Sequence, residues 1–135
     1  MKKLFQLSFL PRSVDCALLL LRVWFGLSML LNHGWGKLMN FSGTATKAPD
    51  PLHIGGLASW ILLVFAEVIC AALLVLGLGT RFAALVIAID MAVAFTMAHH
   101  MKFSNPGSGE LAFLYLGAAL VILFAGSGKY AVDGA

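Results

Sequence analysis

Four long apolar stretches limit what this chain can fold into more than any other feature of its sequence. They cover about residues 15–36, 57–77, 82–99 and 111–126. A membrane-spanning helix needs about 20 mainly apolar residues, and none of the stretches alternates apolar and polar residues as a membrane β-strand does. The sequence therefore predicts an all-α integral membrane protein, with residues 1–135 forming one four-transmembrane-helix bundle.

The composition agrees with this class. Of the 135 residues, 61% are hydrophobic and 11% are charged, with a mean hydropathy of +0.94, which is too apolar for a soluble domain of this size. The net charge of +3 comes from Lys and Arg residues scattered between the apolar stretches, so a lipid bilayer is the expected partner and nucleic acid is not. Cys16 and Cys70 are far apart, and neither a metal or iron–sulfur motif nor a nucleotide fingerprint is present.

The basic residues also predict an orientation. Lys2, Lys3, Arg12, Arg81 and Lys129 lie on the side of the termini, against Lys37, Lys47 and Lys102 on the other side. Since cytoplasmic loops carry the excess of Lys and Arg, both termini are expected in the cytoplasm and loop 38–56 outside. Residues 1–14 are expected to form a short amphipathic segment on the membrane surface.

Three charged residues lie near the middle of the apolar stretches, namely Arg22, Glu67 and Asp90. Each would cost about 2.5 to 3.5 kcal/mol at the centre of a lipid-exposed helix, and their sequence positions suggest a similar depth. We therefore expect them to meet in one internal cluster. Because two carboxyls share one guanidinium there, one carboxyl is expected to hold a proton. The alternative is a buried ion cluster that only fixes the register of the helices.

A second polar group is expected at the outer membrane boundary. His33 and Lys37 end the first stretch, His99 ends the third and Glu110 opens the fourth. Glu110 can also simply complement the dipole of its helix. Neighbouring histidines point about 100° apart on a helix, and no HxxxH or HExxH spacing occurs, so no metal site is predicted. The group suits proton exchange beside a head group or a small substrate.

Several short motifs, in their order along the chain, resemble the DoxX family. The motifs are Leu21-Arg22, His33-Gly-Trp-Gly-Lys37, Glu67 in an apolar helix, Leu76-Gly-Leu-Gly-Thr-Arg81, Gly109-Glu-Leu-Ala-Phe-Leu-Tyr-Leu116 and Gly126-Ser-Gly-Lys-Tyr130. The resemblance covers nearly the whole chain. It implies a small bacterial or archaeal inner-membrane protein of four helices, from a family linked in some members to quinone-dependent sulfur oxidation and redox stress.

The function expected from these features is that of a membrane component of a quinone-linked oxidoreductase or redox-stress system. His33 and Glu110 are the expected catalytic, proton-exchanging residues. The expected substrate-binding residues are Trp35, Phe95 and Tyr115 along an apolar slot, Lys37 and His99 at its outer end, and Arg22, Glu67 and Asp90 on its inner side. Electrons would come from a soluble redox partner subunit or a bound donor, and a homo-oligomer is possible. Whether the chain is an enzyme by itself stays open.

Two other classes of protein fit the same pattern. A proton-coupled carrier of a small solute would also place ionisable groups at the middle of the membrane, although a chain of this length would have to oligomerise. A structural anchor of a larger complex would need none of the charges at this depth. Binding of quinone, or uptake of solute into proteoliposomes, separates these classes.

Overall fold

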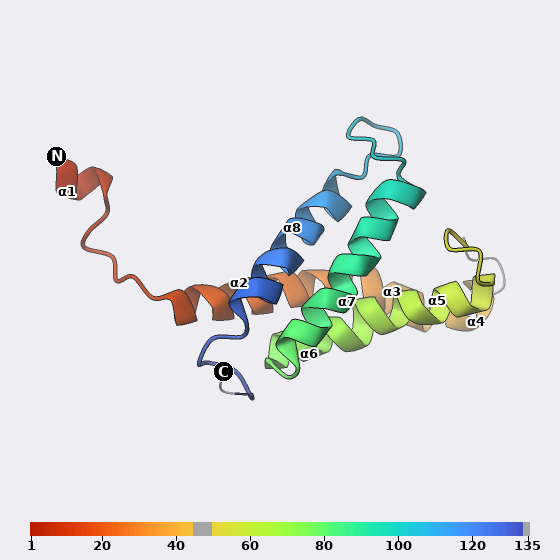
Figure 1. Ribbon diagram of the computed structural model, residues 1–135, viewed down its shortest axis with the longest axis horizontal. Coiled ribbons are helices and arrows are strands. Elements are labelled where there is room, and N and C mark those ends of the chain that lie inside the picture. The colour runs from red at the N-terminus through yellow and green to blue at the C-terminus, as the bar shows by residue number, and fades with distance from the viewer. Residues whose placement is uncertain (45–49, 134–135) are drawn as a thin grey trace.

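The computed structural model describes residues 1–44 and 50–133, and in this part of the chain all regular structure is helical (Figure 1). Lys47, which was counted in the orientation argument, lies outside the described residues. Three continuous helical stretches each contain a π-helical segment. In chain order the helices are α1 (Lys2–Phe5), α2 (Val14–Met29), η1 (Leu30–Gly34), α3 (Trp35–Met39), α4 (Phe41–Thr44), α5 (Gly56–Val64), η3 (Phe65–Cys70), α6 (Ala71–Leu76), α7 (Thr80–Val93), η4 (Ala94–Ala98) and α8 (Glu110–Ala125).

Three of the four predicted apolar stretches form helices long and apolar enough to cross a membrane. They are Val14–Met39, Gly56–Leu76 and Thr80–Ala98, which confirms the all-α membrane class. The fourth, α8, is an apolar helix of 16 residues. At 1.5 Å per residue it is about 24 Å long, shorter than the hydrocarbon core of about 30 Å.

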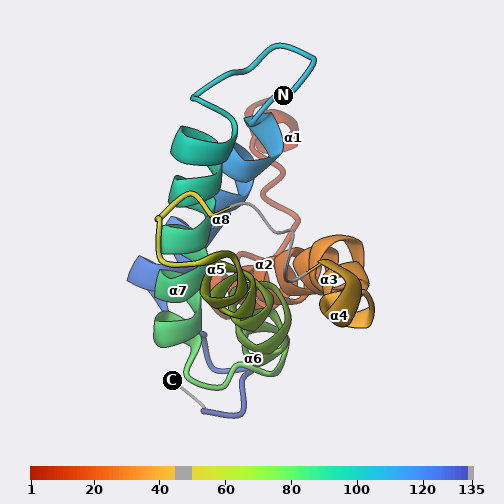
Figure 2. The same cartoon turned by 90° about the vertical axis from the view of Figure 1, so that its right-hand side faces the viewer.

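The helices form two pairs that cross. The α2–α3 stretch packs against the α5–α6 stretch, whereas α8 packs along α7. The α6 and α7 helices meet at a tight turn, and from there the α5–α6 stretch and α7 diverge, as two perpendicular views show (Figures 1 and 2). Fully buried side chains fill the region where the pairs meet, among them Met29, Leu74, Ile87, Ala119 and Ile122. A wedge between α5 and α7 lies beyond this core.

The turn between α6 and α7 is formed by glycine, and Thr80 does not cap the helix that follows. Gly77 takes a left-handed conformation, with φ of 76°, at the end of α6. Thr80 is the first residue of α7, and its buried hydroxyl has no hydrogen-bond partner among the described residues. The carboxylate of Asp133 instead accepts a hydrogen bond of 2.6 Å from the Gly79 backbone nitrogen. The C-terminal segment therefore helps to close this end of the bundle.

Arg22 joins the same end of the bundle. Its side chain is fully buried, and its Nη1 donates to the carbonyl oxygens of Leu74 at 2.7 Å and Val75 at 3.3 Å. Its Nε donates to the carbonyl of Ser127 at 3.0 Å, and its Nη2 to that of Tyr130 at 2.5 Å. The guanidinium thus fastens the last turn of α6 to the C-terminal segment.

The expected cluster of Arg22 with Glu67 and Asp90 is therefore wrong. The last carbonyls of a helix have no intrahelical partner and carry the negative end of the helix dipole. Together with the carbonyls of Ser127 and Tyr130, they offer Arg22 acceptors without a carboxylate. Because the helices cross, residues at similar positions along their stretches do not lie beside one another, and the carboxylates of Glu67 and Asp90 have neighbours other than Arg22.

Candidate functional site

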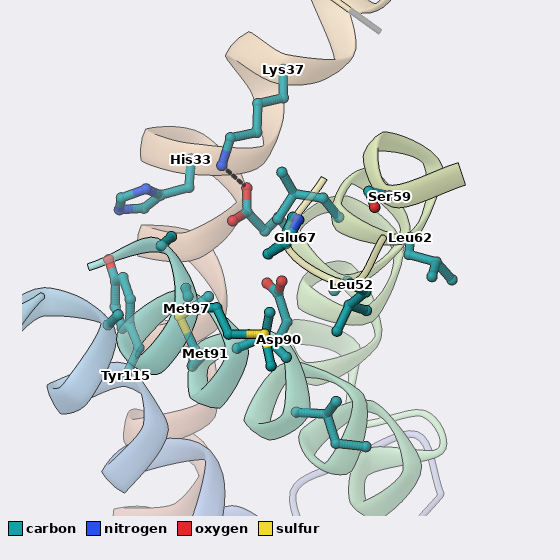
Figure 3. A pocket seen from close by; sticks show the side chains of 18 of the residues that line it. His33, Lys37, Leu52, Ser59, Leu62, Glu67, Asp90, Met91, Met97 and Tyr115 are labelled. Carbon is teal, nitrogen blue, oxygen red and sulfur yellow. Dashed lines mark hydrogen bonds and ion pairs between the residues drawn. The ribbon is translucent and has the colours of Figure 1, made fainter. Parts of the chain in front are cut away.

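A cavity of about 1000 Å³ lies between the two helix pairs (Figure 3). Its wall is mainly apolar, and polar side chains from four helical stretches reach it. Those that the sequence analysis singled out are His33, Lys37, Glu67, Asp90, His99 and Tyr115. A large apolar pocket with a few converging polar groups is the usual form of a small-molecule site.

The three π-helical segments all contribute to this cavity. His33 belongs to η1, Glu67 to η3 and Met97 to η4, and each lines the pocket. Single π-helical turns within α-helices are frequent at functional sites, because they interrupt the regular ladder and turn the following side chains to a new direction. Sequence periodicity does not reveal them.

Gly34 allows two of these segments to touch. A Cβ atom at this position would overlap the carbonyl oxygen of Glu67 and lie 2.8 Å from its carbonyl carbon. The backbones of η1 and η3 can therefore approach closely only because residue 34 has no side chain. This contact brings the next turn of the first stretch, with Lys37, above Glu67.

Lys37 and Glu67 form an ion pair at the top of the cavity. Lys37 Nζ donates to Glu67 Oε2 at 2.5 Å, with 29% of the lysine side chain and 4% of the glutamate side chain exposed. Figure 3 shows the lysine reaching down from its helix to the carboxylate. The cation beside Glu67 is thus Lys37 and not Arg22, since a lysine can bury its apolar stem while its ammonium group reaches a partner.

Asp90 points into the same cavity, below Glu67 (Figure 3). Its Oδ2 is buried and has no hydrogen-bond partner in the described part of the chain. Trp60 also lines the cavity, and its buried Nε1 has no partner there either. A buried polar atom without a partner costs about 1 to 3 kcal/mol. The cavity therefore contains one acceptor and one donor that a bound molecule could satisfy.

His33 and Tyr115 form the opposite side of the cavity. Their rings pack edge to face with centroids 5.4 Å apart, and the Tyr115 hydroxyl shares a hydrogen bond of 2.6 Å with Ser28 Oγ. The hydrogen bond with Ser28 holds the phenol in place, and the imidazole ring of His33 lies beside it. His99 lies at the end of the cavity nearest the loop before α8, where its Nδ1 is 3.1 Å from the carbonyl oxygen of Gly107.

Four of the expected site residues do not line this cavity. Glu110 is exposed at the start of α8, and Trp35 is exposed on α3. Phe95 is buried against Phe103 and Phe113, with ring centroids 5.2 and 5.3 Å away. Arg22 lies at the other end of the bundle. The geometry therefore gives no support to a proton-exchanging role of Glu110 in this cavity.

The segment after residue 49 lines the cavity and was not singled out from the sequence. Asp50 accepts hydrogen bonds from the backbone nitrogens of Ile54 at 3.0 Å and Gly55 at 2.8 Å, and from Ser59 Oγ at 2.7 Å. The hydrogen bond from Ser59 has the largest effect and those from the backbone add to it, so the pKa of Asp50 lies below its ordinary value of 3.8. The carboxylate is thus ionised at neutral pH. The stability that its three hydrogen bonds contribute is lost only as the pH falls into the acid range. An Asp-Pro pair before two glycines is typical of such a turn.

Among the residues that the structure describes, no group of three or more His, Cys, Asp or Glu side chains is placed to hold a metal ion. The polar groups of the cavity suit hydrogen bonding and proton exchange.

The ion pair gives a direct test of this geometry. Lys37→Met leaves the Glu67 carboxylate buried without its cation, so we expect it to lower the free energy of unfolding by about 1.5 to 3 kcal/mol. Lys37→Met with Glu67→Gln should recover much of this loss, because a neutral amide is cheaper to bury. Thermal unfolding in detergent measures both. Lys102→Met, at an exposed position, is the control, and a Lys37→Met variant as stable as this control would contradict the pair.

Comparison with known proteins places these residues in a family context. The DoxX family model matches residues 17–100, a range that contains His33, Lys37, Glu67 and Asp90. A protein of Haemophilus influenzae described as uncharacterized is 33% identical over 112 residues, which are 78% of this chain and 80% of that protein. No solved structure matches the chain.

Proposed function

The chain belongs to the DoxX family, and from this premise we propose that it is the membrane component of a quinone-linked oxidoreductase or redox-stress system. In this proposal the cavity between the helix pairs binds a quinone head group. The supporting observation is the Asp90 carboxyl oxygen, which is buried in a largely apolar cavity and has no partner in the described residues.

The residues of the cavity fit a quinone ring chemically. The ring has two oxygens that accept hydrogen bonds in the oxidised form and donate them in the reduced form. Lys37, His33 and Tyr115 offer hydrogen-bond donors on one side, whereas Asp90 offers an unpartnered oxygen on the other. Apolar side chains such as Met91 face the ring between them. The volume of about 1000 Å³ is at the upper end of the range for ligand pockets, so a quinone ring fits within the cavity.

Reduction of a quinone consumes two electrons and two protons. We propose that a soluble redox partner subunit supplies the electrons, while this chain binds the ring and exchanges protons. His33 and Asp90 are the side chains of the cavity suited to that exchange, since each can hold a proton beside the ring. The ion pair of Lys37 with Glu67 would remain neutral overall and would orient the quinone ring.

We extend the proposal to four membrane crossings with both termini in the cytoplasm. The α8 helix packs along α7, and it would span the membrane with local thinning of the bilayer at its ends. The Lys129 backbone nitrogen donates to Asp15 Oδ1 at 3.0 Å, so the chain returns to the end where α2 begins. This return fits an even number of crossings, and the distribution of Lys and Arg favours the cytoplasm for that end.

The proposal is tested by adding a tail-less dimethoxy-benzoquinone to the purified protein and following tryptophan fluorescence. Saturable quenching is expected, and Trp60→Phe should remove most of it because Trp60 lines the cavity. Asp90→Asn and His33→Ala should each weaken binding by about tenfold, which corresponds to the loss of one strong hydrogen bond of about 1.4 kcal/mol.

Glu110→Gln is the matched control, because Glu110 is exposed and lies outside the cavity. Its affinity should equal that of the parent. If Asp90→Asn and His33→Ala both bind quinone like the parent, the proposed site is wrong. Saturable solute uptake by proteoliposomes without any quinone binding would favour the proton-coupled carrier instead.

A further inference from the structure

One wall of the cavity is shared with the lipid. Leu62 on α5, Ile89 on α7 and Met97 on η4 all line the cavity, yet they are 53%, 57% and 48% exposed. They belong to helices long and apolar enough to cross a membrane. Exposed apolar side chains on such helices face hydrocarbon chains rather than water. The cavity therefore borders the bilayer between α5 and α7.

The path of the helices explains this opening. The α7 helix packs against η3, the segment that follows α5, but α5 itself leads away from α7 toward the start of its own stretch (Figures 1 and 2). The two helices thus form a wedge whose broad side faces outward. Leu62 and Ile89 stand on its two sides, and Asp90 follows Ile89 on the inner face.

The other end of the cavity is lined by loops. Asp50, Pro51 and Leu52 lie there, and the three hydrogen bonds of Asp50 hold this segment against the start of α5. Ser108 lines the cavity from the loop before α8, and its hydroxyl donates to the Phe103 carbonyl at 2.9 Å. These fixed loop segments stand between the cavity and the aqueous side, whereas the exposed apolar side chains of Leu62 and Ile89 line it where α5 and α7 face the lipid.

The charges of the cavity select the kind of head group. The only salt bridge among the described residues pairs Lys37 with Glu67, so this cation is already neutralised, and Asp90 adds a second carboxyl group nearby. A phosphate would meet two carboxyls and one engaged ammonium group, which is unfavourable. A neutral head group avoids this repulsion and can still bond to Asp90.

We infer that the cavity is a lateral site for a neutral, single-tailed isoprenoid quinone, which enters from the bilayer between α5 and α7 and leaves its tail between Leu62 and Ile89. This inference rests on the proposed function and adds the class of ligand and its route. A tail that stays among lipid chains avoids exposure to water, which costs about 0.8 kcal/mol for each methylene group. A route through the outer loops would expose that tail.

Narrowing the wedge tests the route. Leu62→Trp and Ile89→Trp place a large side chain on either side of it. Each variant is reconstituted with an isoprenoid quinone, repurified, and extracted so that the retained quinone can be counted by chromatography. Affinity for the tail-less dimethoxy-benzoquinone is measured by equilibrium dialysis. We expect retention of the tailed quinone to fall by about tenfold, while tail-less affinity stays within about twofold of the parent.

Matched controls exist on the same two helices. Ile61 on α5 and Leu85 on α7 are 49% and 44% exposed but do not line the cavity. Ile61→Trp and Leu85→Trp should retain the tailed quinone like the parent. Thermal unfolding of all four tryptophan variants shows whether they fold equally well. Leu62→Ala and Ile89→Ala widen the wedge and should retain the tailed quinone.

The outcomes separate this inference from the proposed function. If the tail-less quinone does not bind the parent, the proposed function fails. If it binds the parent but the wedge variants and their controls retain the tailed quinone equally, the lateral route is wrong. Equal loss of tailed and tail-less binding would also overturn the route, because the substitutions would then act on the head-group site. Retention of phospholipid in place of quinone would assign the wedge to an acyl chain.

Discussion

Arg22→Ala is expected to lower the free energy of unfolding by about 3 to 5 kcal/mol, a loss large enough to prevent stable folding. The guanidinium is fully buried and donates to backbone carbonyls of Leu74, Val75, Ser127 and Tyr130. Its removal takes away the hydrogen bonds that it donates to these carbonyls and opens a cavity at the end of α6. Arg22→Lys should recover only part of the loss, because an ammonium group cannot reproduce the planar fork of the guanidinium.

Thermal unfolding in detergent, followed by circular dichroism, measures this effect. Arg81→Ala is the matched control, since Arg81 is exposed and donates a hydrogen bond of 2.9 Å to the carbonyl of Leu123. We expect this control to lose less than about 1 kcal/mol. A result in which Arg22→Ala and Arg81→Ala lose similar stability would contradict the role assigned to Arg22.

A mutant cycle distinguishes this role from the carboxylate cluster expected from the sequence. If Arg22 compensated Glu67 and Asp90, then Arg22→Met together with Glu67→Gln and Asp90→Asn would recover stability. The structure predicts no such recovery, because the partners of Arg22 are carbonyls at a separate site. The loss from Arg22→Met should therefore add, within about 0.5 kcal/mol, to that of the Glu67→Gln and Asp90→Asn double variant.

Gly34→Ala should have the second large effect, lowering the free energy of unfolding by about 3 kcal/mol. The new methyl group would overlap the carbonyl of Glu67 and lie 2.9 Å from Val68 Cγ2. A backbone carbonyl within a helix cannot move aside as a side chain can, so η1 and η3 must separate. Lys37 would then withdraw from Glu67, and we expect quinone affinity to fall together with stability.

Gly36→Ala is a close control for this prediction. Gly36 lies in the same helical stretch, two residues further on, and a Cβ atom there would meet nothing within 4 Å. It should be as stable as the parent, or slightly more stable because alanine favours helix. The same melting and binding measurements apply to both variants. Equal stability of the two would contradict the close approach of the η1 and η3 backbones at Gly34.

The sequence by itself determined the class, the approximate helix bounds and most polar residues of the cavity. Hydropathy and length are local properties, so stretches such as 57–77 and 82–99 could be placed within a few residues of the observed helices. Charged residues inside apolar helices must face the protein interior, since lipid offers them no partner. This reasoning led to Glu67 and Asp90, whereas Lys37 was expected in the polar group at the end of the first stretch.

Only the tertiary structure decided which partner each charge has. Sequence position gives only the approximate depth of a Cα atom in the membrane. The end of a long side chain can lie a full helical turn away from that depth. Where helices cross, residues at equivalent positions along them also lie at different depths. Arg22 therefore meets backbone carbonyls at a helix end, and Lys37 reaches Glu67. The contact at Gly34 and the wedge between α5 and α7 depend on how whole helices pack, which no local pattern in the sequence records.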